Sequence, residues 1–188
     1  AITLKVGGYG MIRFLLPIVP DGCIFFSNIV IILSIIAISY IGIITIVQKD
    51  MKKLVAYSSV SHMGFVTLGL FILFSFNSDS RYLRDAIMGI EGSMMQMISH
   101  GFVSGALFIC VGVLYERMHT KLISSYGGVA NKMPIFAVFF MIFSMANAGL
   151  PGTSGFVGEF LVILAVFKVH FLYAFFAGLT LIFGATYT

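Results

Sequence analysis

The sequence predicts an all-α integral membrane protein with about six transmembrane helices, one of which is discontinuous. Of its 188 residues, 60% are hydrophobic and only 10% are charged, and the mean hydropathy is +1.07; soluble domains hold roughly 25% charged residues. Several separate apolar runs reach about 18 residues, enough to cross a hydrocarbon core of about 30 Å as a helix. A membrane barrel would show shorter, alternating segments, so helices are favoured.

The predicted spans follow the apolar runs and form one transmembrane domain over residues 1–188. They are 1–19, 24–47, 51–76, 86–114, 134–167 and an incomplete 171–188. The second is the clearest because it carries no charge. The first is the least hydrophobic and ends at a group of residues typical of helix ends, Pro17, Pro20, Asp21 and Gly22. Because the chain begins and ends inside apolar runs, we interpret it as a segment of something longer.

The fifth span is too long for one straight crossing and is expected to be broken near 149–155. The residues that predict the break are Gly149, Pro151, Gly152 and Gly155. Proline removes a backbone donor and disfavours helix in the residue before it, and glycine permits turns. The break is expected to free backbone carbonyls and amides at membrane depth, where they must be buried in protein or line a wet cavity.

Basic residues between the spans predict the orientation. Six lie on one side: Lys49, Lys52, Lys53, Arg117, Lys121 and Lys132. The other side holds Arg81, Arg84 and Lys168, with Arg13 nearby. The positive-inside rule places the first group on the cytoplasmic or matrix face.

The remaining composition excludes several functional classes. The net charge of +4 gathers between the apolar runs, as membrane anchors do, and does not form a nucleic-acid-binding patch. Two distant cysteines, Cys23 and Cys110, are too few for a metal cluster or a disulfide framework. We therefore expect no cofactor and no metal in this chain.

Four ionisable residues lie inside apolar runs: Lys5, His62, His100 and Glu159. A charge at mid-bilayer costs at least about 2.5 kcal/mol on insertion scales, so such residues mark functional sites. Each histidine alone could be a core residue bonded to a neighbouring serine or carbonyl. Four together favour a shared polar interior that relays protons, and Glu159 lies just inside the second half of the broken span.

Polar side chains at helical spacing support this interpretation. One face of the fourth span carries Ser93, Gln96, His100 and Ser104. On the third span, Ser58 lies one turn before His62. On the first, Tyr9 lies one turn after Lys5. Polar faces on three helices could surround a hydrated path.

Five strings in collinear order resemble a known family: "LKVGGYGMIRF" (4–14), "DMKKLVAYSSVSHMGFV" (50–66), "MISHGFVSGALF" (97–108), "LYERMHT" (114–120) and "GLPGTSGFVGEF" (149–160). They look like the subunit 4 group of mitochondrial NADH:ubiquinone oxidoreductase, respiratory complex I. That group belongs to the antiporter-like, proton-pumping subunits, which also occur in multi-subunit cation/proton antiporters. The resemblance covers nearly the whole chain.

The resemblance implies an inverted-repeat fold of which this chain is the C-terminal part, about helices eight to thirteen. It implies that Lys5 is the central lysine of the proton path, that His62 and His100 are its relay histidines, and that Glu159 takes up and releases the pumped proton. Sister subunits typically have lysine at the last position, so Glu159 favours the subunit 4 group.

The resemblance also implies a setting: proton translocation across the mitochondrial inner membrane, coupled to electron transfer from NADH to ubiquinone elsewhere in the complex. A bacterial plasma membrane is the second choice. FMN, iron–sulfur clusters and ubiquinone would lie in other parts of the complex. The expected partners are other membrane-arm subunits, lipids, and a separate chain supplying the upstream helices, unless the sequence is itself incomplete.

Two alternative functions are open. The chain could belong to a secondary Na⁺/H⁺ antiporter, or be a structural piece of the membrane arm whose channel is inactive. Residues 76–89 are longer than the usual loop of the family and could make a lineage-specific contact.

Overall fold

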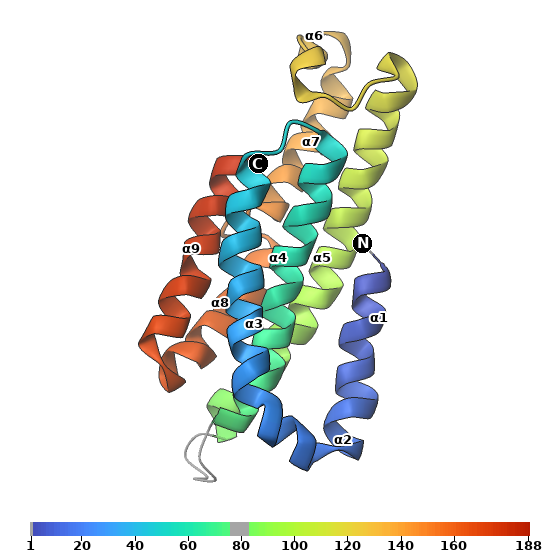
Figure 1. The fold of residues 1–188 in the computed structure, drawn as a ribbon. Coiled ribbons are helices and arrows are strands. Elements are labelled where there is room, and N and C mark those ends of the chain that lie inside the picture. The colour runs from blue at the N-terminus through green and yellow to red at the C-terminus, as the bar shows by residue number, and fades with distance from the viewer. Residues whose placement is uncertain (1, 76–82) are drawn as a thin grey trace.

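The computed structural model describes residues 2–75 and 83–188 and shows an elongated bundle of helices (Figure 1). The α-helices are α1 (Thr3–Gly10), α2 (Leu16–Ile18), α3 (Pro20–Ile46), α4 (Met51–Phe71), α5 (Leu83–Met118), α6 (Val129–Lys132), α7 (Pro134–Asn147), α8 (Ser154–Val169) and α9 (Phe171–Tyr187). A π-helical turn covers Met11–Leu15, and 3₁₀ turns cover Ile72–Ser75 and Ile123–Ser125. Within the described ranges the chain forms no strand, which agrees with the predicted all-α class.

The long helices follow the predicted spans closely. Among the described residues, three segments are long and apolar enough to cross a membrane: Pro20–Ile46, Met51–Ser75 and Arg84–Met118. The fifth span is divided into α7 and α8, and α9 is a shorter apolar helix. The contact suggested for residues 76–89 falls largely on 76–82, which lie outside the described residues.

The first span is less regular than its apolar run indicates. The amide of Leu16 donates to the carbonyl of Met11, five residues earlier, which widens one turn into a π-helix. At the end of α2 the backbone of Val19 leaves the helical region, with φ −128° and ψ 58°. Pro20 then begins α3, where its missing amide costs nothing. This corner reverses the chain direction between α1 and α3 (Figure 1).

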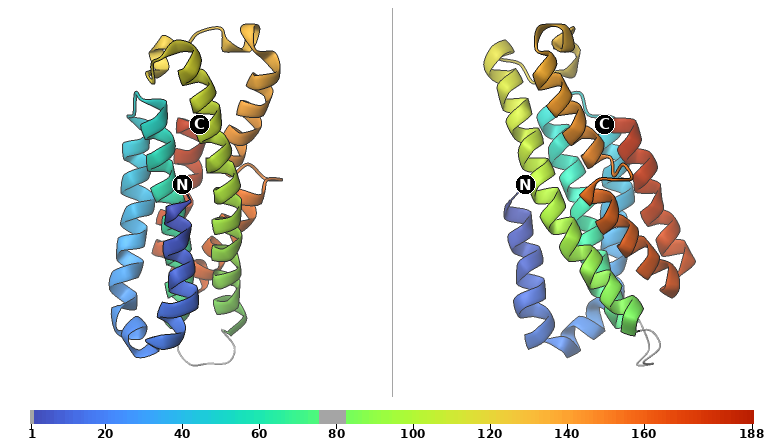
Figure 2. Two further views of the ribbon diagram at one scale, coloured as in Figure 1. Left: turned by 90° about the vertical axis from the view of Figure 1, so that its right-hand side faces the viewer. Right: turned by 180° about the vertical axis from the view of Figure 1, so that it is seen from behind.

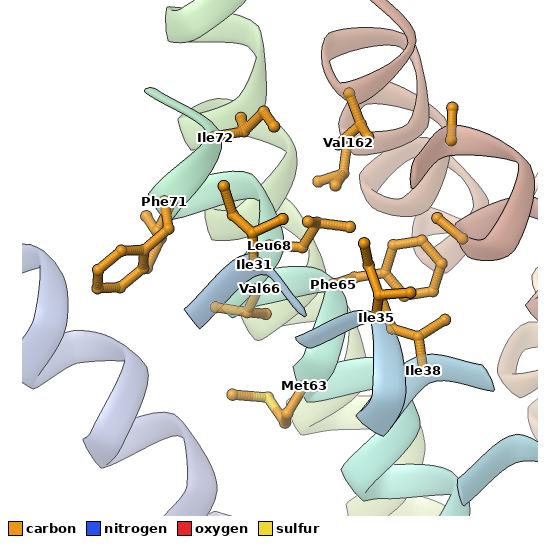
Figure 3. Close-up of a cluster of buried hydrophobic side chains, with 14 of the residues drawn as sticks. Ile31, Ile35, Ile38, Met63, Phe65, Val66, Leu68, Phe71, Ile72 and Val162 are labelled. Atoms are coloured by element: carbon orange, nitrogen blue, oxygen red, sulfur yellow. The ribbon is translucent and has the colours of Figure 1, made fainter. Parts of the chain in front are cut away.

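Helix α4 is the central helix of the bundle, with α3 on one side and α5 on another. In an 18-residue stretch of each long segment, 72% of the residues are buried for Met51–Ser75, against 33% for Pro20–Ile46 and 39% for Arg84–Met118, although the mean hydropathy of 1.5 is the lowest of the three. Figure 3 shows its apolar contacts, with Ile31 and Ile38 of α3 close to Phe65 and Leu68 of α4. A helix that is both least apolar and most buried indicates a polar interior.

The two most basic connections meet at one end of the bundle. The amide of Met51 donates to the carbonyl of Lys121 at 3.0 Å, and that of Ile123 donates to the carbonyl of Lys49 at 3.0 Å. Asp50 also caps α4 by accepting from the amides of Lys52 and Lys53. Figure 2 shows both connections at the same end, the arrangement on which the charge count relies.

Helices α5 and α8 approach closely at Gly158. A Cβ built on this residue would lie 2.8 Å from both the backbone nitrogen and the side-chain Oε1 of Gln96. Because backbone cannot yield as a flexible side chain can, any larger residue would push the two helices apart. Gly158 therefore sets the spacing at which α8 packs on α5.

We expect Gly158→Ala to destabilise the protein by about 1–3 kcal/mol, the usual effect of overpacking a close contact. The measurement is the thermal stability of the full-length protein extracted from its membrane. Gly112→Ala on α5 is the matched control, because nothing lies within 4 Å of its added methyl group; it should be neutral or slightly stabilising. Equal melting temperatures for the two variants would contradict the proposed contact.

Candidate functional site

A buried hydrogen bond between a histidine and a glutamate lies at the centre of the bundle. Nδ1 of His62 on α4 is 2.7 Å from Oε1 of Glu159 on α8. The side-chain amide of Gln96 on α5 donates to the same Oε1 at 2.9 Å. The three residues are 2–3% exposed. Three helices that are distant in sequence therefore converge on one carboxylate oxygen.

A second pair lies beside the first. Lys5 on α1 is hydrogen-bonded to Nδ1 of His100, one turn after Gln96 on α5. The rings of His100 and His62 are 5.2 Å apart between centroids. Since an ammonium group only donates, Nδ1 of His100 accepts and its Nε2 carries the proton of the neutral ring. The four predicted ionisable residues are thus brought together.

Direct contacts, more than the dipole of α8, stabilise the carboxylate. Glu159 is the sixth residue of α8, and the dipole effect falls off within the first turn. A buried charge is tolerated only when its lone pairs are satisfied at close range. His62 and Gln96 supply these contacts to Oε1, so removing either partner would leave the buried acid poorly compensated.

The supporting polar positions divide into two groups. Of the predicted stripe on α5, the side chain of Gln96 donates a hydrogen bond to Glu159. The hydroxyls of the buried serines donate instead to backbone carbonyls: Ser58 to Val55, Ser93 to Val66 and Gly89, and Ser104 to His100. These hydroxyl groups thus satisfy backbone carbonyls inside the bundle.

Tyr9 is not brought to the site. Its side chain is 57% exposed and packs edge-to-face against Phe14. The reason is that α1 touches α5 through Gly8, where an added Cβ would collide with the sulfur of Met97. The contacting face of α1 therefore runs from Lys5 to Gly8 and leaves Tyr9 outside it.

The break between α7 and α8 is closed by its own backbone. The amide of Leu150 donates to the carbonyl of Met145 and that of Gly149 to the carbonyl of Ala146, with Gly149 at φ +73°. This is a Schellman motif, which satisfies carbonyls that a helix end would otherwise leave open. The expectation that the break frees these carbonyls is therefore wrong for the end of α7.

The other break residues have different positions. Pro151 is exposed in the turn and Gly152 has φ +99°. Gly155 does not lie in the break itself but is the second residue of α8. Its added Cβ would lie 2.9 Å from the carbonyl of Ala146, so this glycine lets the start of α8 pack against the end of α7.

Gly149 also lies against the acid. A Cβ on this residue would be 3.0 Å from Oε2 of Glu159. The left-handed conformation and this contact both require glycine at the position. The turn that ends α7 therefore forms one wall of the carboxylate site.

The sequence interpretation missed several polar groups of the site, among them Tyr187 and Asn147. The hydroxyl of Tyr187 on α9 is 3.5 Å from Nε2 of His62. Asn147, the last residue of α7, is 5% exposed beside the cluster. The sequence does carry a signal for Asn147, because it is a polar residue in an apolar run next to a break. The signal for Tyr187 is weak, because a tyrosine in an apolar helix is common. Within the described part of the chain, no group of three His, Cys, Asp or Glu residues could hold a metal ion.

Comparison with known proteins identifies the family. Residues 1–184 match the family described as NADH:quinone oxidoreductase/Mrp antiporter, transmembrane. The chain belongs to this family. It is 51% identical over its whole length to NADH-quinone oxidoreductase subunit M of Rhodobacter capsulatus, and 50% identical to NADH-ubiquinone oxidoreductase chain 4 of Chondrus crispus. It spans 34% and 36% of these relatives.

A solved structure of the family shares the fold. The chain is similar to one chain of respiratory complex I from Thermus thermophilus with bound NADH, with a TM-score of 0.88 and 33% identity. The match covers 99% of this chain and 37% of that one. The resemblance to the antiporter-like subunits of complex I and the all-α membrane fold are thus both confirmed.

We expect Gly149→Ala to impair the site more than Gly152→Ala. Both substitutions place a methyl group at positive φ, which costs about 1–2 kcal/mol, but only the first presses on Glu159; nothing lies within 4 Å of the second. The melting temperature of the full-length protein extracted from its membrane should fall more for Gly149→Ala than for Gly152→Ala. Equal losses would mean that backbone strain alone is responsible.

Proposed function

We propose that this chain translocates protons as part of an antiporter-like subunit of the membrane arm of NADH:quinone oxidoreductase. One observation carries the proposal: a lysine, two histidines and a glutamate from four helices meet in the interior of a bundle whose outer surface is apolar. Ionisable groups are expensive inside a membrane and mark proton and ion paths. A purely structural bundle would not need four of them.

Each residue has a role that its contacts allow. Lys5 gives a proton to Nδ1 of His100, and the imidazole releases the proton carried by its other nitrogen. Glu159 takes up a proton at its carboxylate, and His62 stabilises the charged form of the acid through Nδ1. A transfer from Lys5 to Glu159 leaves two neutral groups where two charges stood, so it changes the electrostatic field of the bundle without adding net charge.

The names and organisms of the relatives support two settings. Proteins named chain 4 occur in Chondrus crispus and Marchantia polymorpha, and those named subunit M occur in Rhodobacter capsulatus and several Rickettsia species. We propose the mitochondrial inner membrane, with the bacterial plasma membrane as the alternative. The energy would come from electron transfer between NADH and ubiquinone, through FMN and iron–sulfur clusters held by other subunits.

The partners are part of the proposal. The other membrane-arm subunits and lipids would surround this chain. Large apolar side chains on the outer faces of α3 and α7, such as Phe25 and Ile135, support a lipid or protein environment there.

A secondary Na⁺/H⁺ antiporter is the second candidate, because the family description covers both classes. The names of the relatives above favour the oxidoreductase. Purification of the protein from its native membrane separates the two: flavin and iron–sulfur subunits should accompany it. A compact assembly without them, exchanging Na⁺ for H⁺ in the absence of NADH, would favour the antiporter.

We expect Glu159→Gln, made in the full-length protein within its complex, to abolish most proton pumping while NADH-dependent quinone reduction and assembly persist. Glutamine keeps the shape of the side chain but takes up no proton. The readout is the number of protons pumped per NADH oxidised in sealed vesicles. Glu116→Gln, an exposed acid at the end of α5, is the control. Unchanged pumping in Glu159→Gln would support an inactive, structural role for the chain.

Lys5→Arg separates proton transfer from fixed charge. Arginine keeps the positive charge beside His100 but is not deprotonated in proteins, so we expect most pumping to be lost. Lys168→Arg, at the exposed end of α8, should pump normally. If Lys5→Arg pumps as well as the unchanged protein, the lysine acts only as a fixed charge.

A further inference from the structure

Three buried polar atoms near the hydrogen bond between His62 and Glu159 have no hydrogen-bond partner within the described chain. They are Oε1 of Gln96, Nε2 of His100 and Oδ1 of Asn147. Their residues are 2%, 4% and 5% exposed. An unsatisfied buried polar atom costs about 1–3 kcal/mol. Such atoms are rare and each needs an explanation. Here three occur together.

All three residues line the same small cavity. Its volume is about 10 Å³, and His62 and Glu159 also contribute to its wall. One water molecule needs roughly this volume when the volume is measured for the water's centre. The walls come from α4, α5, α7 and α8, so the cavity lies where the break brings the end of α7 against the relay helices.

The donors and acceptors match one water molecule. Because Lys5 donates to Nδ1 of His100, Nε2 of the neutral ring carries hydrogen and is a donor. Because the amide nitrogen of Gln96 donates to Glu159, its oxygen is the acceptor, and the oxygen of Asn147 is another. A water molecule accepts one hydrogen bond from Nε2 and donates its two hydrogens to the amide oxygens. Buried waters typically make about three hydrogen bonds.

We propose that this cavity binds one ordered water molecule, held by Gln96, His100 and Asn147, and that this water carries the proton between His100 and Glu159. The proposal rests on the proton transfer described above and assigns Asn147 as its positioning residue. Asn147 contacts neither the lysine nor the acid by any hydrogen bond described in this structure, and acts through the water.

The transfer balances in protons and charge. The Lys5 ammonium passes one proton to Nδ1 of His100, and Nε2 passes its proton to the water. The water then turns one of its own hydrogens from an amide oxygen to the Glu159 carboxylate, which lines the same cavity, and passes that hydrogen to it as a proton. The ammonium and carboxylate become an amine and a carboxylic acid, and the water and the imidazole end neutral. The proton thus moves from His100 to Glu159 without passing through His62, whose ring lies 5.2 Å from that of His100 between centroids.

The direct experiment is a high-resolution structure of the full complex that contains this chain. The expected result is a density peak within hydrogen-bond distance, about 2.7–3.2 Å, of all three atoms. An empty cavity, or an Asn147 oxygen that accepts from a protein donor, would overturn the proposal.

Substitutions at Asn147 test the role of the water in transfer. Asn147→Leu keeps the approximate size but removes the acceptor, and should lose most proton pumping while quinone reduction and assembly persist. Asn147→Ala leaves room for a second water to replace the lost oxygen, and should retain more pumping than the leucine variant. Asn131→Leu, on the exposed α6, is the matched control and should pump normally.

The order of the two variants distinguishes positioning from packing. A packing role predicts the opposite order, because alanine leaves the larger cavity; alanine pumping less than leucine would overturn the proposal, as would normal pumping by Asn147→Leu. Glu159→Gln tests the proton relay separately from the water site. If it loses pumping while Asn147→Leu keeps it, the relay stands and the water site fails; if both keep it, the relay itself fails.

Discussion

The hydrogen bond between His62 and Glu159 is the constraint around which the bundle is organised. An acid in the middle of an apolar protein must have close partners, because neither lipid nor hydrocarbon side chains can solvate it. That requirement explains why α4, the least apolar of the three long spans, is the most buried of the three. It also explains the two glycines beside these side chains. Gly149 lies against the carboxylate of Glu159, and Gly158 lies against its partner Gln96. Packing and charge compensation are satisfied by the same residues.

The break between α7 and α8 serves this arrangement in a different way from the one that its sequence suggests. A Schellman turn closes the end of α7, in which the carbonyls of Met145 and Ala146 accept hydrogen bonds from the amides of Leu150 and Gly149. Its effect is to displace α8 from the axis of α7 (Figure 2). The displacement allows Glu159 on α8 and Asn147 on α7 to line one cavity. A continuous helix would place these residues twelve positions apart on one axis, about 18 Å from each other.

The sequence predicts the fold class, most span boundaries and the four ionisable residues, because a charge in an apolar run is expensive and therefore conspicuous. It predicts less well which polar neighbours join them. Helical spacing places Ser104 on the same face as His100, but a helical serine readily bonds a carbonyl of the preceding turn, and Ser104 does so. Spacing also cannot tell which flank of α1 meets α5, so Tyr9 is misplaced. Tyr187 meets His62 through a contact between distant segments, which no local pattern encodes, whereas Asn147 carries a local signal in its place next to the break.

The π-helical turn at Met11–Leu15 determines the rotational phase of α1. An α-helix advances by about 100° for each residue, so one residue more or fewer in this turn would rotate everything before it by that angle about the helix axis. Lys5 would then face away from His100, although every side chain in the relay were unchanged. The segment between Gly10 and Pro17 therefore tolerates substitution better than insertion or deletion. Its length, more than its composition, is what the bundle requires of it.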